Sequence, residues 1–145
     1  MGGKMRRAAV LTILALAIAA AGPVAPGTQT AGLERLPLRV TNAAAGPIAC
    51  AAQIAHWFAM PLADIAPGAT AEIALWRHPE SGTVMILNAR GEALPVERIW
   101  CGHAGRAWQT RAQIAIDRSR PAAPIALSCG AGDERLVCLP HAHRP

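Results

Sequence analysis

The chain has 145 residues, of which 52% are hydrophobic, with four cysteines and a formal net charge of +5. Three of its fourteen basic residues lie in the first seven positions, so the remainder holds eleven basic residues against nine acidic ones. A charge this close to balance excludes the strongly basic footprint of a nucleic-acid-binding domain, and we expect no nucleic-acid partner.

The first 21 residues have the pattern of a secretory signal peptide. Lys4, Arg6 and Arg7 precede an apolar run that ends in small residues. The run spans about 14 residues, whereas an apolar helix needs ~20 to cross a bilayer. We therefore predict cleavage after Ala21, no stable membrane anchor in the mature chain, and a periplasmic or secreted location. An uncleaved anchor is the alternative.

The rest of the chain is predicted to form a single domain between two irregular ends. Residues 22–35 are rich in Gly, Pro, Thr and Ala without periodicity, which is typical of a flexible lead-in. Residues 36–140 show no repeat and have the length of one ordinary domain, here a β-sandwich domain. Residues 141–145 are predicted to be a polar tail.

The first strand signals surround a segment that is hard to assign. Residues 36–41 alternate between apolar and other side chains, which is the period of a half-buried strand. Residues 48–58 fit a strand by their aromatic end and their neighbours, or a helix that Pro47 begins. We predict a strand, and Met60-Pro61 breaks its pattern.

The following segments show regular strand and turn signals. Residues 62–65 are predicted to be a short strand or bend. A Pro-Gly turn then leads to a strand at residues 71–76. Residues 83–87 and 94–101 read as a hairpin joined by turn-forming residues.

Two further strand signals lie toward the end of the chain. Residues 108–117 alternate most regularly of all and are predicted to be one long strand. Residues 125–129 and 136–139 are predicted to form a final hairpin around a Gly-rich turn.

Seven to eight short strands separated by turn signals predict an all-β fold. We expect a small antiparallel β-sandwich, immunoglobulin-like in the broad sense, with two disulfides. The specific immunoglobulin pattern is not met, because Trp57 follows Cys50 by only seven residues and the chain contains no tyrosine. The prediction therefore covers the architecture and no particular family.

The four cysteines are predicted to form these two disulfides. In a short exported chain, cysteines favour disulfides over a zinc site, and zinc-type spacing is absent. Cys129 and Cys138 would face each other in the final hairpin, at the ~4.5–5.5 Å that a disulfide can bridge. By elimination, Cys50 would pair with Cys101, although four cysteines permit three pairings and the sequence alone does not select one.

A candidate binding patch comes from the tryptophans. Trp57 and Trp76 fall opposite the apolar residues of their strands, and Arg77 follows the second of them. Tryptophan and arginine are enriched at binding hot spots, so these three residues are the candidate patch. The alternative is that the rings fill the ends of the sandwich.

A candidate metal site is the second option for function. His56 and Met60 stand four residues apart, and His103 follows Cys101 by two. Imidazole and thioether ligands suit copper, and imidazole also suits zinc. The simpler interpretation is that these are ordinary partly buried or loop residues, so we expect no cofactor.

No catalytic motif is evident in the sequence. It lacks a nucleophile elbow, a phosphate loop and a dinucleotide fingerprint, so we predict that the protein is not an enzyme. We expect an exported binding or accessory protein of the bacterial periplasm that contacts another envelope protein through a sheet face or edge. The alternatives are an extracytoplasmic protein that handles copper or zinc through His and Met residues, and a structural subunit of an envelope assembly.

Overall fold

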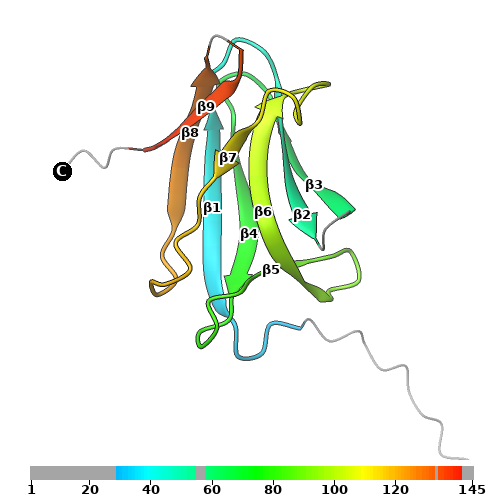
Figure 1. The fold of residues 1–145 in the computed structure, drawn as a ribbon, viewed down its shortest axis with the longest axis vertical. Coiled ribbons are helices and arrows are strands. Elements are labelled where there is room, and N and C mark those ends of the chain that lie inside the picture. Colours follow the sequence, from blue (N-terminus) through cyan, green and yellow to red (C-terminus); the bar gives the residue numbers. More distant parts are fainter. Residues whose placement is uncertain (1–28, 55–57, 133, 142–145) are drawn as a thin grey trace, which may run out of the picture.

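The computed structural model describes residues 29–54, 58–132 and 134–141, and this part of the chain is all-β (Figure 1). It contains no helix, and therefore none that could span a membrane, among the residues described. The strands are β1 (Glu34–Asn42), β2 (Ile48–Ile54), β3 (Phe58–Ile65), β4 (Thr70–Arg77), β5 (Val84–Leu87), β6 (Ala93–His103), β7 (Ala112–Ile114), β8 (Ile125–Ala131) and β9 (Leu136–Pro140). The all-β class is confirmed, with slightly more strands than the sequence predicted.

The strands are hydrogen-bonded in the order β3-β2-β6-β5-β4-β1-β8-β9, with β7 beside β6. The long, curved β6 joins two groups of strands, because its first residues pair with β5 and its later residues pair with β2 and β7 (Figure 1). We call β3-β2-β6-β7 the four-strand group and β6-β5-β4-β1-β8-β9 the six-strand group.

One pair of strands runs parallel, so the prediction of a purely antiparallel fold is wrong. β1 pairs with β4 antiparallel and with β8 parallel, Leu38 lying opposite Ile125. Hairpins can only produce antiparallel neighbours, whereas β1 and β8 are separated by most of the chain and can take either direction. The sheet is therefore mixed.

Alternating side chains from both strand groups pack into one hydrophobic cluster. On β1, Leu36, Leu38 and Val40 are buried, and on β2 the buried residues include Ile48 and Ile54. Leu38 and Val40 are fully excluded from solvent. Truncating such a side chain typically costs about 2–5 kcal/mol, so this cluster is the main source of stability.

The described part of the predicted strand at residues 48–58, Ile48–Ile54 and Phe58, is extended, and 55–57 lie outside the described residues. β2 ends at Ile54, and β3 begins at Phe58 and continues through Pro61 to Ile65. Proline is tolerated there because β3 is an edge strand, where a missing N–H donor costs little. The register shifts next to it, leaving Leu62 without an opposite residue, which is a β-bulge.

The predicted long strand at residues 108–117 is the largest error, since only Ala112–Ile114 is strand. The Thr110 hydroxyl accepts a hydrogen bond from the His103 N–H (2.9 Å) and donates one to the Arg106 carbonyl (2.8 Å). These bonds fold the preceding loop back onto β6. At Gly102 a Cβ atom would lie 2.1 Å from the Ala107 carbonyl oxygen, so only glycine permits this close approach.

Both predicted hairpins are present. β5 and β6 are joined by a turn in which the Asn88 side chain accepts hydrogen bonds from the N–H groups of Arg90 and Glu92. Gly91 in this turn has a positive φ of 77°. β8 and β9 form the second hairpin, with Cys129 directly opposite Cys138.

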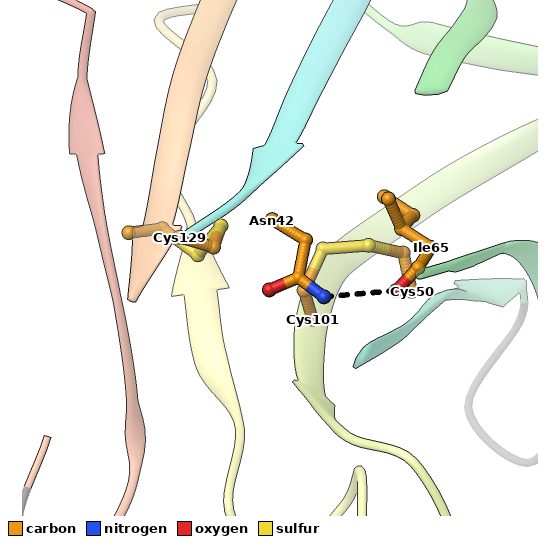
Figure 2. Close-up of a disulfide and its surroundings, with 6 residues drawn as sticks. Asn42, Cys50, Ile65, Cys101 and Cys129 are labelled. Carbon is orange, nitrogen blue, oxygen red and sulfur yellow. Dashed lines mark hydrogen bonds between the residues drawn. A yellow bond between two sulfur atoms is a disulfide. The ribbon is translucent and has the colours of Figure 1, made fainter. Parts of the chain in front are cut away.

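The two predicted disulfides are confirmed, Cys50 with Cys101 and Cys129 with Cys138. Figure 2 shows the side chain of Asn42 between Cys129 and the Cys50–Cys101 bond. This amide is fully buried and donates to the carbonyls of Gly46 and Ile65 at 2.9 Å each.

The oxygen of the same amide accepts from the Ala44 N–H at 2.9 Å. Three hydrogen bonds therefore satisfy the side chain of Asn42 inside the core, as a buried amide requires. They tie the end of β1 to the end of β3.

Candidate binding surface

One side of the six-strand group faces away from the hydrophobic cluster and is only partly covered. Because side chains alternate along a strand, residues directly opposite each other on neighbouring strands share this side. We call it the outer face, and its main members are Arg35, Pro37 and Arg39 on β1, Glu72, Ala74 and Trp76 on β4, Met85 on β5, Ser128 on β8, and Val137 and Leu139 on β9.

The β9 end of the outer face exposes two large apolar side chains. Val137 is 47% exposed and Leu139 is 62% exposed. They lie opposite Gly130 and Ser128 of β8, which are too small to cover them. Together with Phe58 and Trp108 they are the exposed large hydrophobic residues of the described chain, and neighbouring exposed apolar side chains are a common feature of interaction sites.

The middle of the outer face carries an excess of positive charge. The guanidinium groups of Arg35 and Arg39 lie 3.8 and 3.3 Å from the Glu72 carboxylate, so two cations share one anion. Both arginines remain mostly exposed, and such exposed ion pairs contribute little to stability. A hollow of about 300 Å³ lies beside them and extends to Pro124 and Ala126.

Trp76 lies at the other end of the outer face, half-buried between Arg35 of β1 and Met85 of β5. Its indole Nε1 is buried without a hydrogen-bond partner. The ring also lines a cleft of about 430 Å³ where β3 approaches β4 at the end of β5. The other residues around this cleft are Met60, Pro61, Leu62, Ile73, Ala74, Ile86, Leu87, Asn88 and Ala89.

The first half of β4 has an unpaired edge beside this cleft. The His78 N–H donates to the Thr83 carbonyl, on the side of β4 that faces β5. Because peptide groups alternate in direction along a strand, those of Glu72 and Thr70 point to this same side. β5 ends at Leu87, whose position along the ladder is opposite Ala74. No strand among the described residues pairs with β4 beyond that point on this side. Unpaired strand edges can accept another extended chain.

Two of the three residues of the predicted patch are described, and their side chains point to opposite sides of β4. Arg77 is only 7% exposed, and its guanidinium donates to Glu34 (3.0 Å) and to the carbonyls of Pro79 and Arg118. It therefore points to the inner side of β4, whereas Trp76 points outward. Trp57 lies outside the described residues, so the patch as a whole stays a prediction.

Of the three residues proposed for metal binding, the structure describes two, and these two lie far apart. Met60 lies opposite Ala52 and lines the cleft, whereas His103 lies opposite Ile48 at the end of β6. Four positions along β2 correspond to about 13 Å, which is too far for one ion. His56 falls outside the described part. Within that part, no three His, Cys, Asp or Glu side chains gather as metal ligands.

An aromatic cluster, made by Trp100 and Trp108, lies on the four-strand group. The rings of Trp100 and Trp108 are 5.1 Å apart at 78°, and the Arg111 guanidinium lies 3.9 Å above Trp108. This contact arises from the loop that replaces the predicted strand. Arg111 also donates to the Trp108 carbonyl, so the cluster satisfies its own cation and fixes the loop.

Several residues of the outer face were not singled out from the sequence. Arg35 was placed in the lead-in, although it lies beside Trp76 in the sheet. Val137 and Leu139 belong to a nearly continuous apolar run, which hides their exposure. An alternation count that started from the buried Leu136 would have placed both on the open side.

The comparisons with known proteins add no functional information. No family model, no curated protein and no solved structure matches this chain. The function must therefore be argued from the arrangement of the chain's own residues.

Proposed function

We propose that this chain is an exported, non-catalytic binding or accessory protein of the bacterial periplasm. Its outer face contacts another envelope protein. The observation that carries this proposal is the composition of that face, where exposed Val137 and Leu139, the arginine pair around Glu72, and Trp76 occur together. Apolar side chains combined with arginine and tryptophan are typical of protein interfaces.

The proposed architecture is a β-sandwich that is immunoglobulin-like in the broad sense. Its support is the division into two strand groups that contribute to one hydrophobic cluster, with β6 shared between them. Such a sandwich leaves one face of each group open to solvent. The outer face is then the open face of the larger group.

The compartment is inferred from the cysteines and the N-terminal pattern. Two disulfides are typical of proteins that fold in an oxidising environment outside the cytoplasm. The basic and apolar start of the chain fits export by a signal peptide. Cleavage after Ala21 would place residues 22–145 in the periplasm.

The partner is proposed to use both the outer face and the cleft next to it. An extended segment could lie along the unpaired half of β4 and place an apolar side chain beside Trp76 and Met60. An acidic residue on the partner would complement Arg35 and Arg39, which exceed their single carboxylate in charge.

Position-specific photo-crosslinking in the native cell envelope tests this proposal. A photoreactive side chain would be introduced at Leu139 or at Ala74, and in separate cells at Ala59, an exposed residue of β3 that serves as the control. We expect one discrete crosslinked product from the first two positions and none from Ala59.

Charge-reversal variants in the same experiment test whether the crosslink depends on the arginines of the outer face. Arg39→Glu should reduce the crosslink at Leu139 about tenfold, because it replaces a complementary charge by a repulsive one. Arg90→Glu, at the exposed β5–β6 turn, is the matched charge control and should leave the crosslink intact. Equal crosslinking from all three positions, or none from the outer face, would reject the proposal. Native mass spectrometry that finds stoichiometric copper or zinc would instead favour metal handling.

A further inference from the structure

The two disulfides differ in what surrounds them. Cys50 and Cys101 are 2% and 0% exposed, and their strands have neighbours on both sides, β3 beyond β2 and β7 beyond β6. Asn42 lies next to this bond in the core (Figure 2). Neither sulfur can be reached by a thiol while the chain is folded.

The Cys129–Cys138 bond joins β8 and β9, the last two strands in the order of hydrogen-bonded strands. Cys129 is fully buried, but Cys138 is partly exposed on β9, which has β8 as its single hydrogen-bonded neighbour in the described sheet. Cys129–Cys138 is therefore the more exposed of the two disulfides, through Cys138. Accessibility of one sulfur is sufficient for thiol–disulfide exchange.

Besides the disulfide, the second half of β9 is held by its backbone pairing with β8 and, just after it, by the His141 N–H, which donates to the Ala126 carbonyl at 2.8 Å. Leu136 is buried, and its N–H donates to the Thr110 carbonyl at 2.7 Å. Beyond it, Val137, Leu139 and Pro140 are exposed and bury little apolar surface. The disulfide is the covalent cross-link between this half of β9 and β8.

We propose that the Cys129–Cys138 disulfide is a redox-sensitive latch that keeps β9 on β8. A dithiol reductant opens it in the folded protein while Cys50–Cys101 stays closed, and the opening releases β9. The released strand leaves the edge of β8 unpaired and removes Val137 and Leu139 from the outer face. The latch is independent of the proposed partner, because it rests on the position of the bond alone.

The reaction is an ordinary two-step exchange. One thiolate of the reductant attacks the Cys138 sulfur, forming a mixed disulfide and expelling the Cys129 thiolate. The second thiolate of the reductant then attacks its own linked sulfur and expels the Cys138 thiolate. Both cysteine thiolates take up protons, and the dithiol, which has lost two electrons and two protons, becomes a cyclic disulfide.

Graded reduction of the full, folded chain tests the order of opening. The oxidised protein would be treated with dithiothreitol, the free thiols alkylated at intervals, and each cysteine peptide quantified by mass spectrometry. We expect Cys129 and Cys138 to be alkylated at least about tenfold faster than Cys50 and Cys101. Simultaneous modification of all four cysteines, or earlier modification of Cys50 and Cys101, would overturn the proposal.

Hydrogen exchange tests the release of β9 separately. After selective reduction, the amides of residues 136–139 should exchange at least about tenfold faster, while those of residues 99–103 in β6 should not change. The Cys129→Ala/Cys138→Ala variant should show the same pattern without reductant. Unchanged protection of β9 in the reduced protein, or in this variant, would show that the disulfide is not a latch.

Discussion

In β2–β6 and in β8–β9, a cysteine faces its partner directly across an antiparallel strand pair, at the same Cα separation of 4.0 Å. The first pair lies within the hydrogen-bonded order and is buried, whereas the second lies at the end of the order, with Cys138 partly exposed. The local geometry is the same, but the two bonds close loops of different length, which sets their contributions to stability, and they have different neighbouring strands, which sets their accessibility. The first bond stabilises the core, and the second restrains an edge.

The largest effect is expected from removal of the central bond. Cys50→Ala/Cys101→Ala should lower the free energy of unfolding by about 4 kcal/mol, because the bond closes a loop of 51 residues in the unfolded chain. Guanidinium unfolding followed by tryptophan fluorescence measures this loss. A loss below about 1 kcal/mol would mean that the central bond is as dispensable as a surface feature.

Asn42→Ala should come next, with a loss of about 3 kcal/mol, because two buried hydrogen-bonding groups and one part-buried group lose their partner. Asn88→Ala is the matched control. Asn88 makes a similar set of turn bonds but is only partly buried, so water can replace the amide. We expect the control to lose about 1 kcal/mol in the same unfolding assay, and equal losses at both positions would contradict the role of burial.

Removal of the edge bond should cost less than removal of the central bond. Cys129→Ala/Cys138→Ala is expected to lower the free energy of unfolding by about 2.7 kcal/mol, since the closed loop spans nine residues. The same denaturation experiment, run on both double variants, ranks the two bonds directly. A reversed ranking would show that loop length does not decide the contribution.

The smallest effect is expected at the exposed β5–β6 turn. The hydrogen bond from Asn88, followed by the charge of Arg90, holds the pKa of Glu92 below its ordinary value. A carboxyl with a lowered pKa stabilises the fold above its unfolded-state pKa, and this contribution disappears as the pH falls toward the folded-state value. The Tm of Glu92→Gln should therefore decline less steeply than the wild-type Tm below about pH 4.5.

Glu80→Gln, at an exposed turn position, serves as the control for this pH dependence. Thermal melts of the three proteins between about pH 6 and pH 3 provide the measurement. Wild-type and Glu92→Gln curves that run parallel over this range would show that the turn carboxyl contributes nothing to the pH dependence of stability.

The features that could be predicted from the sequence are those set by near neighbours in the chain. Alternation located most strands, and the short turn between β8 and β9 placed Cys129 opposite Cys138. Because only four cysteines exist, that pair also determined the other one. The apolar sides of β1, β2 and β4 followed from the same alternation.

The features that could not be predicted depend on distant contacts. The regular pattern at residues 108–117 is overridden by the hydrogen bonds of Thr110 and by the loop that packs on Gly102. Arg77 looks like a surface residue in sequence, but it is turned inward by Glu34 and Arg118, which lie about 40 residues away on either side. The parallel pairing of β1 with β8 has no local signal at all.

That parallel pairing has a consequence for the order in which the protein can fold. β1 lies between β4 and β8 (Figure 1), so the first strand made by the ribosome lacks one neighbour until residues 125–131 have been synthesised. Contacts between residues this far apart in sequence form slowly. The parallel part of the sheet can therefore be completed only late in the synthesis of the chain.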